Sequence, residues 1–362
     1  MVSLIIVGFG NVGRSLADIM LKDREYLHKT FGFNSEIRVI CELKGALINK
    51  NGIDVESLLK LKDISQSSDW VPDKTALDVI KEVDADILVE CSWVNKDTGE
   101  PAVSTLITAM NRKMHIVSSN KGPFYLKYKE LKEAADNNEV MMGMESTVLS
   151  AVPALAAKTT LAGTHIKSIR GILNGTCNYI LSQMTQNGSS FDDALKEAKD
   201  LGYAEADPTL DINGYDAAGK IVILANVLLG WDKTIKDADI KGITEVTTEK
   251  IEQAKKENKY IKHVCTAKDG KLTAGVELIP MNSTLAVMGS LNLVEIETVH
   301  AGPYTLIGRG AGGPEAAAGI LSDVINISQL NKGIYYDADS ELIKNTEIKS
   351  HNLGLERQNF DL

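Results

Sequence analysis

Short apolar runs alternate with amphipathic stretches through roughly the first 145 residues of the chain. The apolar runs are rich in β-branched residues, so each is expected to form a buried strand, and the amphipathic stretches are expected to form helices. Strands are predicted at Val2–Val7, Ile37–Cys41, Asp86–Glu90, His115–Ser118 and Val140–Met144. Helices are predicted at Arg14–His28, Asp54–Leu61, Thr75–Val83 and Pro101–Arg112, with a further helix ending near Ala135. This order predicts an α/β fold with a doubly wound parallel sheet, and we expect these five strands to belong to a six-stranded sheet.

The alternation stops at Glu145–Pro153, a loop suited to a binding turn or a domain crossover. The pattern that follows predicts an α+β domain with its own sheet. Its predicted elements are strands at Ile166–Ile172, Leu293–His300 and Tyr304–Ile307, a hairpin at Lys259–Pro280 turning at Asp269-Gly270, and a long apolar helix at Gly214–Gly230. The helix predicted at Glu315–Ile327 resembles the packing helices of the first domain. We therefore expect domains at residues 1–145 and 146–308, with residues 309–362 returning to the first domain and ending in a tail.

A glycine motif, Gly8-Phe9-Gly10-Asn11-Val12-Gly13, directly follows the first predicted strand and opens the first helix. In this context G-x-G-x-x-G binds a dinucleotide. The first glycine allows the tight turn, the second lets the backbone approach a pyrophosphate, and the third lets the helix pack against the strand. Free N–H groups at the helix N-terminus face the phosphates. A glycine-rich structural turn is the alternative, but the context favours a Rossmann-type NAD(P)-binding domain.

Charged residues after the second predicted strand bear on the choice of cofactor. Glu42 closes that strand, where an acidic residue binds the ribose 2′-hydroxyl of NAD, and Lys44 follows, where a basic residue can hold the 2′-phosphate of NADP. Both are present, so the sequence leaves NAD and NADP open. Ser92 and Lys121 follow later strands, at the edge of the sheet where ligands bind. A capping serine and a surface lysine are equally consistent with those positions.

The stretch from Gly202 to Lys220 concentrates residues that suit acid–base chemistry. Asp216 and Lys220 are four apart on a predicted helix, so they share one helix face, and a lysine held beside an aspartate can donate a proton. Glu205 and Asp211, in the preceding loop, suit the ammonium of an amino-acid substrate. A surface ion pair beside a solvated acidic loop would give the same spacing.

A second glycine-rich loop, residues 308–314, precedes the helix at Glu315–Ile327. If the chain returns to its first domain there, Gly312 would lie near the nicotinamide of a bound cofactor. A flexible linker before a packing helix would have the same composition, so both interpretations stay open.

Composition narrows the partners and the compartment. The 362 residues carry a formal net charge of −10 without any lysine- or arginine-rich block, so nucleic acid and anionic membranes are not expected partners. No apolar run reaches membrane-spanning length. The four cysteines (Cys41, Cys91, Cys177 and Cys265) include no C-x-x-C pair. They suggest neither a zinc site nor a disulfide framework, and favour the reducing cytoplasm.

Together these motifs resemble the homoserine dehydrogenase family over nearly the whole chain, from the strand before Gly8 to about Leu330. The resemblance rests on Gly8–Gly13, Ser119–Lys121, Glu145–Pro153, Asn174–Asn178, Gly202–Pro208, Asp211–Lys220 and Gly310–Gly313. It implies an NAD(P)-dependent oxidoreductase that interconverts L-homoserine and L-aspartate 4-semialdehyde, on the route to threonine, methionine and isoleucine. It also implies a homodimer whose second domain serves substrate binding, catalysis and dimerisation.

The resemblance also implies roles for single residues. Lys220 would be the proton donor and Asp216 its partner. The substrate would be bound by Glu205, Asp211, Thr176 and Lys121, the last also meeting the nicotinamide. A monovalent cation, Na⁺, would be held by backbone carbonyls of Glu145, Val148, Ser150 and Val152, although this loop is bulkier than the family's. The tail after Leu330 is too short for the regulatory domain of some members, so feedback inhibition through such a domain is not expected.

Two rival functions would use a similar chain. An aspartate-semialdehyde dehydrogenase needs a cysteine that forms a thioester; Cys91 and Cys177 are the candidates, but neither has a convincing histidine partner in the sequence. A regulatory protein that senses NAD(P) would bind the cofactor without turnover. Such a sensor does not need the Asp216–Lys220 pair.

Overall fold

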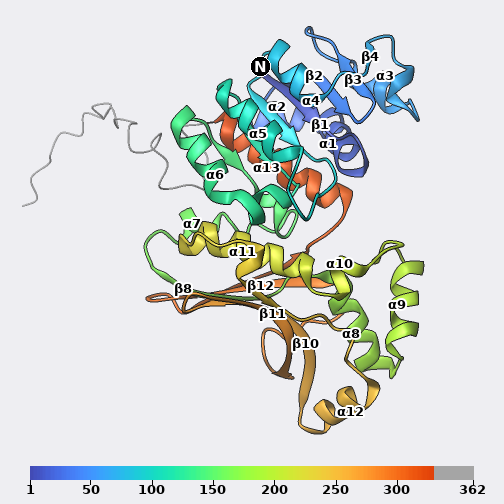
Figure 1. The fold of residues 1–362 in the computed structure, drawn as a ribbon, viewed down its shortest axis with the longest axis vertical. Coiled ribbons are helices and arrows are strands. Elements are labelled where there is room, and N and C mark those ends of the chain that lie inside the picture. Colours follow the sequence, from blue (N-terminus) through green and yellow to red (C-terminus); the bar gives the residue numbers. More distant parts are fainter. Residues whose placement is uncertain (330–362) are drawn as a thin grey trace, which may run out of the picture.

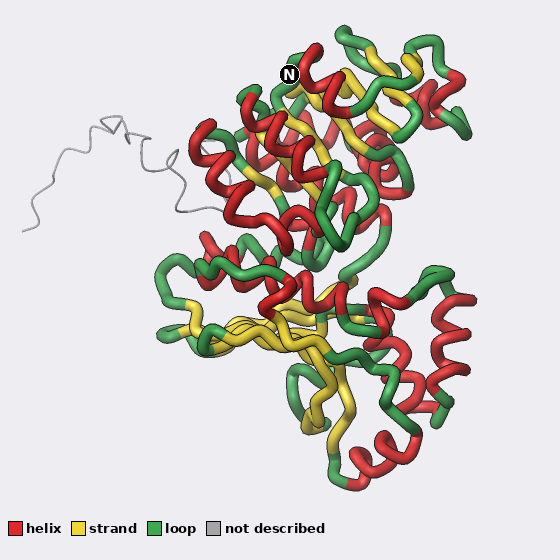
Figure 2. The backbone as a smooth tube through the Cα atoms, viewed as in Figure 1, coloured by secondary structure: helices red, strands yellow, loops and turns green. Residues whose placement is uncertain are grey.

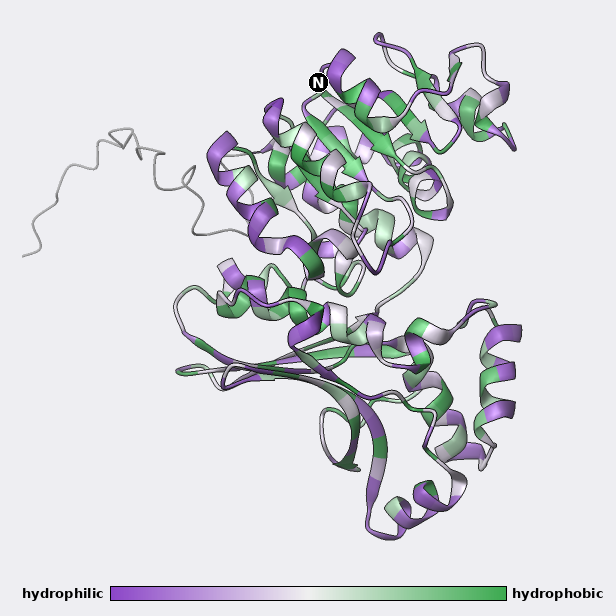
Figure 3. Ribbon diagram, in the orientation of Figure 1, coloured by the Kyte–Doolittle hydropathy of each residue, from purple (hydrophilic) through white to green (hydrophobic). Residues whose placement is uncertain are grey.

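The first strand is the centre of the N-terminal domain. In the computed structural model, which describes residues 1–329, β1 (Val2–Val7) directs Ile5 and Val7 to one face of a sheet and Leu4 and Ile6 to the other. All four side chains are buried, because helices cover both faces (Figure 2). A strand buried on both sides requires a continuous apolar run. Figure 3 shows the central strands of the N-terminal domain as mostly hydrophobic.

The sheet has seven strands in the order β4-β3-β2-β1-β5-β6-β7 (Figure 1). The others are β2 (Ser35–Glu42), β3 (Gly45–Ile48), β4 (Trp70–Pro72), β5 (Ile87–Glu90), β6 (His115–Ser118) and β7 (Met142–Gly143). Strands β2, β1, β5, β6 and β7 are parallel, whereas β3 and β4 add an antiparallel edge. The predicted doubly wound α/β fold is confirmed, but the predicted number of six strands is wrong, because the sheet has seven. β3 and β4 have only four and three residues, too few to show a period in the sequence.

Helices pack on both faces of this sheet. One face carries α1 (Asn11–Lys22), α2 (Arg24–Phe31), α3 (Val55–Leu59) and α13 (Gly313–Ser328). The other carries α4 (Ala76–Glu82), α5 (Ala102–Asn111) and α6 (Gly122–Asn138), and a 3₁₀ turn, η1 (Ile64–Gln66), precedes β4. The single helix predicted at Arg14–His28 is two helices, because the chain leaves helical geometry at Asp23 (φ −98°, ψ 11°).

The second domain contains a six-stranded sheet in the order β13-β12-β8-β10-β11-β9. Its strands are β8 (Ile166–Ile172), β9 (Ala238–Ile240), β10 (Lys259–Lys268), β11 (Lys271–Pro280), β12 (Leu291–Thr298) and β13 (Pro303–Arg309). Neighbouring strands are antiparallel except β9, which is parallel to β11. The predicted hairpin is confirmed: β10 and β11 pair over their whole length, and both turn residues, Asp269 and Gly270, have positive φ.

The central helix of the second domain is α11 (Tyr215–Leu229), which lies between this sheet and the N-terminal domain (Figure 1). It starts after Gly214 (φ 85°) and ends before Gly230 (φ 68°), and every residue from 217 to 228 is buried. A Cβ at Gly219 would lie 2.6 Å from the ring of Tyr125 on α6, so a glycine lets the two domains pack closely here. The remaining elements are η2 (Glu145–Thr147), α7 (Ala157–Thr160), α8 (Gly175–Asn187), α9 (Phe191–Asp200), α10 (Thr209–Ile212), η3 (Ile235–Asp237) and α12 (Thr248–Lys256).

The chain returns to its first domain through α13, which packs against α1. The domain limits at 145/146 and 308/309 stay a prediction, and the part of the tail beyond residue 329 lies outside the described residues. Within residues 1–329, no helix combines the length and apolar character needed to cross a bilayer.

Candidate active site

A cleft of about 880 Å³ separates the carboxyl ends of the N-terminal strands from the second domain. It receives α1 and the second glycine-rich loop from one side and the starts of α8 and α11 from the other. The predicted site residues that line it are Asn11, Val12, Ser92, Lys121, Val148, Ser150, Thr176, Glu205, Asp211, Asp216, Lys220 and Gly312. Residues chosen from segments far apart in the sequence therefore share one cavity.

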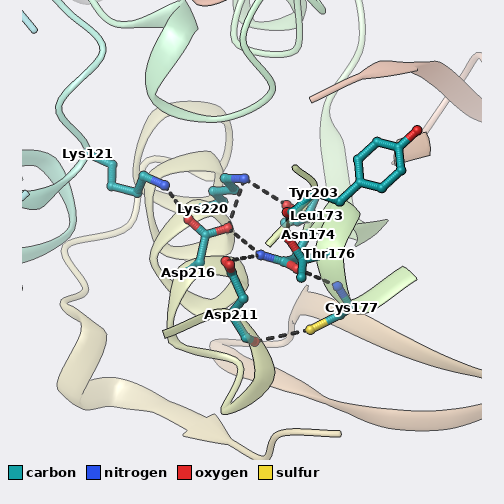
Figure 4. Close-up of polar contacts among 9 residues, drawn as sticks. All are labelled: Lys121, Leu173, Asn174, Thr176, Cys177, Tyr203, Asp211, Asp216 and Lys220. Carbon is teal, nitrogen blue, oxygen red and sulfur yellow. Dashed lines mark hydrogen bonds and ion pairs between the residues drawn. The ribbon is translucent and has the colours of Figure 1, made fainter. Parts of the chain in front are cut away.

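Lys220 and Asp216 form the predicted pair on α11. The Nζ atom of Lys220 lies 2.9 Å from Asp216 Oδ2 and donates a second hydrogen bond, also of 2.9 Å, to the carbonyl of Leu173 (Figure 4). Lys220 is only 6 % exposed, and what remains exposed faces the cleft. The surface ion pair considered from spacing alone is thereby excluded.

Lys121 contacts the same carboxylate, through Asp216 Oδ1, although the two residues are 95 positions apart. Burial alone would raise the pKa of Asp216, but the ammonium groups of Lys121 and Lys220 outweigh it and hold that pKa well below its usual range. Burial would likewise lower the pKa of Lys121, but Asp216 outweighs it and raises that pKa. The centre of the site is therefore one carboxylate held between two lysines.

The two acidic loop residues lie in different environments. Asp211 is partly buried and accepts a hydrogen bond of 2.7 Å from Asn174, and burial, followed by the nearby charge of Asp216, raises its pKa. Glu205 is exposed at the cleft and adds to the negative charge that faces Lys121. Both carboxylates can therefore be reached by a ligand in the cleft.

Thr176 is in the first turn of α8, which Asn174 caps by accepting a hydrogen bond of 2.8 Å from the Cys177 N–H. The Thr176 hydroxyl donates to the carbonyl of Tyr203 at 2.6 Å. This bond fastens the loop that carries Glu205 to the start of α8.

The first glycine motif has the close approaches that its spacing predicted. Gly8 has φ 89°, and a Cβ there would lie 2.8 Å from the backbone of Cys91 and Ser92. A Cβ at Gly13 would overlap the carbonyl of Gly8, whereas Gly10 faces open space. The motif thus leaves room at the start of α1, where Asn11 and Val12 line the cleft, for a phosphate-bearing ligand.

Glu42 closes β2 as predicted, and its Oε1 accepts the N–H of Phe9 at 2.5 Å. This bond ties the carboxylate to the glycine motif, at the place where an acidic residue meets a ribose. Lys44 is exposed in the turn between β2 and β3. Neither residue lines the cavity itself.

Ser92 depends on Glu90, a residue that the sequence reasoning missed. Glu90 is fully buried, and its Oε1 accepts hydrogen bonds from the Ser92 N–H at 2.9 Å and the Ser92 hydroxyl at 2.5 Å. Burial raises the pKa of Glu90, and no described residue bonds its Oε2. The sequence signal for Glu90 is an acidic residue at the end of a short apolar strand.

The second glycine-rich loop reaches the first, as expected from a returning chain. Gly312 (φ 128°) lines the cleft, and a Cβ at Gly313 would lie 2.5 Å from the side chain of Asn11. The adjacent Gly310 lies against Asn292, whose buried amide forms no hydrogen bond with a described residue. Asn292 was also missed, since a lone asparagine in a strand gives no sequence signal.

The Glu145–Val152 loop is buried along most of its length, and Ser150 adopts a positive φ of 56°. The Glu145 carboxylate accepts the N–H groups of Leu155 and Ala156 at 2.8 and 3.1 Å, and burial raises its pKa to about 7. Within residues 1–329, no backbone N–H donates a hydrogen bond to the carbonyls of Val148 and Ser150.

The thiols do not fit thioester chemistry. Cys177 is fully buried and donates to the Asp211 carbonyl, and Cys91 donates to the Gly8 carbonyl. Burial raises the pKa of both thiols above its usual value. A nucleophilic cysteine needs a lowered pKa, so the aspartate-semialdehyde dehydrogenase alternative is disfavoured.

Comparison with known proteins places the chain. A family model described as homoserine dehydrogenase matches residues 153–325. A homoserine dehydrogenase of Methanocaldococcus jannaschii is 44 % identical over 91 % of this chain and 99 % of its own length. An NAD(+)-dependent homoserine dehydrogenase of Pseudomonas canavaninivorans is 39 % identical over 90 % of this chain and 96 % of its own length.

Solved structures of homoserine dehydrogenases have the same fold as this chain. A putative homoserine dehydrogenase from Archaeoglobus fulgidus superimposes with a TM-score of 0.83 at 34 % identity, covering 90 % of this chain and 99 % of that one. A hyperthermophilic archaeal homoserine dehydrogenase in complex with NADPH has a TM-score of 0.80 at 28 % identity, covering 92 % and 99 %. The sequence matches run through both domains and both glycine loops, so the chain belongs to the homoserine dehydrogenase family.

Proposed function

We propose that the chain interconverts L-homoserine and L-aspartate 4-semialdehyde with NAD(P), and that Lys220 transfers the proton at the substrate oxygen. The reaction serves threonine, methionine and isoleucine synthesis, as family membership implies. One observation carries the assignment of Lys220: its ammonium is buried except at the cleft, and it is held there by Asp216 and the Leu173 carbonyl.

The proposed chemistry divides between the cofactor and the chain. NAD(P) supplies hydride transfer, and the chain orients the reactants and moves the proton. When an aldehyde is reduced, negative charge grows on its oxygen; a lysine ammonium stabilises that charge and then donates the proton. In the opposite direction the Lys220 amine accepts the hydroxyl proton. Because oxidation releases a proton overall, alkaline pH should favour homoserine oxidation.

We assign the substrate ammonium to Asp211 and Glu205, whose carboxylates are open to the cleft beside the Asp216–Lys220 pair. Thr176 would hold the substrate at the start of α8, and Lys121 would stand where the substrate meets the nicotinamide. Carboxylates that pair an ammonium select an amino-acid aldehyde over a simple one.

The cofactor would be held by the Gly8–Gly13 motif, Ser92 and Gly312, with Glu42 and Lys44 near the adenosine ribose. The fit is supported by the space that Gly10 leaves in front of α1. One relative is named NAD(+)-dependent and one similar structure contains NADPH, so we propose that both cofactors are accepted.

For the monovalent cation we propose the carbonyls of Glu145, Val148, Ser150 and Val152, with Na⁺ as the ion. The carbonyls of Val148 and Ser150 accept no backbone hydrogen bond from residues 1–329, which supports the site. The carbonyls of Glu145 and Val152 already accept backbone hydrogen bonds from Val148 and Ala154. Each of these two oxygens would therefore have to bind the cation and its N–H donor together.

We further propose a cytoplasmic homodimer. All four cysteines are free thiols, which suits a reducing compartment. On the edge strand β13, Tyr304 and Ile307 are 42 % and 53 % exposed, an apolar contribution to a subunit interface. Sedimentation equilibrium that gives a monomer at micromolar concentration would contradict the dimer.

The activity is tested by mixing the protein with homoserine and NAD or NADP at alkaline pH and following the absorbance of reduced nicotinamide. Lys220→Ala should lower kcat by roughly 10²- to 10⁴-fold, the usual effect of one general acid, with cofactor binding nearly unchanged. Lys196→Ala, which removes an exposed lysine on α9, is the matched control. Turnover of Lys220→Ala within about threefold of wild type would remove Lys220 from the mechanism. Tight cofactor binding by a wild type that does not turn over would favour the NAD(P) sensor.

A further inference from the structure

Asn174 occupies the middle of the polar network in Figure 4. Besides capping α8 with its oxygen, it donates from its amide nitrogen to Asp211 Oδ1 at 2.7 Å and to Asp216 Oδ2 at 2.9 Å. The amide oxygen of Asn174 thus accepts one hydrogen bond while both N–H donors of its amide are in use. A helix cap requires only the oxygen, so the two donated bonds call for a separate explanation.

Those two bonds join carboxylates that would otherwise repel each other. Asp211 and Asp216 come from α10 and the start of α11 and meet at the same nitrogen atom. The charged groups facing Asp211 are Asp216 and Lys220 on α11 and Lys121 at the start of α6. Burial and Asp216 raise the pKa of Asp211, whereas Asn174 and the two lysines oppose that rise.

The backbone next to Asn174 fixes the proton donor as well. The carbonyl of Leu173 accepts the hydrogen bond from Lys220 Nζ. One dipeptide at the entrance to α8 therefore contacts Lys220, Asp216 and Asp211 together, and only the side chain of Asn174 reaches both carboxylates.

We propose that Asn174 is a positioning residue that holds Asp211 and Asp216 side by side in their charged forms. The substrate ammonium and the proton-transferring Lys220 are then kept at one fixed separation. The inference rests on the proposed function, because it assigns Asp211 to the substrate and Lys220 to proton transfer.

The test compares two replacements that both cap helices well, Asn174→Ser and Asn174→Asp. Serine keeps the cap but cannot reach both carboxylates with donated bonds. Aspartate has the size and shape of asparagine but has no N–H group and adds a third negative charge. We expect kcat/KM for homoserine to fall at least about tenfold for serine, the loss of hydrogen bonds to charged groups, and further for aspartate. The acid limb of the kcat/KM profile should move to higher pH in Asn174→Ser, while the Kd for NAD(P) stays within about twofold.

The order of the two variants separates positioning from packing. If Asn174 only filled space and capped α8, aspartate would be the better substitute, and a kcat/KM for Asn174→Asp equal to wild type would overturn the proposal. An unchanged KM and pH profile in Asn174→Ser would overturn it as well. Ser190→Ala, which removes the exposed cap of α9, controls for stability, because it should lower the melting temperature without moving the pH profile. The proposed function fails separately, if wild type does not oxidise homoserine.

Discussion

Lys262 is a buried lysine that should make the stability of the protein depend on pH. It lies on β10, is 1 % exposed, and donates to Asn178 Oδ1 at 2.8 Å and to the Val287 carbonyl at 2.5 Å. Its partners among the described residues are neutral, and burial lowers the pKa of Lys262 from 10.5 to about 7. Through these two hydrogen bonds Lys262 connects α8 to the segment that contains Val287. Ser290, three residues further along that segment, lines the cleft.

The sign and size of the effect follow from proton linkage. In the unfolded chain Lys262 titrates near 10.5, so between that pH and about 7 the unfolded state binds a proton that the folded state does not. The stability contribution of Lys262 is therefore fully present above its pKa in the unfolded chain. It is lost as the pH falls towards and through its lower pKa in the folded protein. The free energy of unfolding should rise by about 2 kcal/mol between pH 7 and 9 from this residue.

The perturbation is Lys262→Met, which keeps an unbranched side chain one atom shorter and removes its charge. Urea unfolding of wild type and variant at pH 7, 8 and 9 gives the difference in free energy at each pH, which cancels the titration of all other groups. We expect the wild type to gain about 2 kcal/mol relative to the variant over this range. The control is Lys268→Met, which changes an exposed lysine at the end of the same strand and should leave the wild-type slope unchanged.

The reasoning is refuted if Lys262→Met has the same pH slope as wild type. It also fails if Lys268→Met removes the slope, because an exposed lysine carries no burial penalty. Absolute stability does not decide the question, since methionine also leaves Asn178 and the Val287 carbonyl without their donor.

Two further predictions concern the cofactor side of the cleft. We expect both cofactors to work, with a modest preference for NADP; Lys44→Ala should raise the KM for NADP about fivefold and leave that for NAD unchanged, as a solvent-exposed charge contact allows. Initial rates with each cofactor measure this, and a strong preference for NAD that survives in Lys44→Ala would contradict it. Gly310→Ala should weaken cofactor binding and lower stability by roughly 1–3 kcal/mol, because the added methyl overlaps the buried side chain of Asn292. The double variant with Asn292→Ala should recover most of the loss in a thermal-unfolding assay; no recovery would locate the strain elsewhere.

The sequence determined those features that depend on neighbours along the chain. Apolar runs long enough to be buried on both faces gave β1 and the parallel strands, and the Gly8–Gly13 spacing gave the turn into α1. Asp216 and Lys220 meet because four residues make about one helical turn. The sequence did not predict β3 and β4, which have four and three residues. A hydrophobic periodicity can be recognised only over several repeats, and these strands are too short to show one.

The tertiary structure decided which distant groups share a space. Lys121 meets Asp216 across 95 positions, Asn174 joins two carboxylates, and Glu42 binds the glycine motif. No local pattern encodes these contacts, because they arise where separate elements pack, and the charge state of each group follows from the burial and the neighbours found there. Residue spacing could therefore propose Lys220 and Asp216, but only packing between the two domains could bury Lys220 and direct it into the cleft.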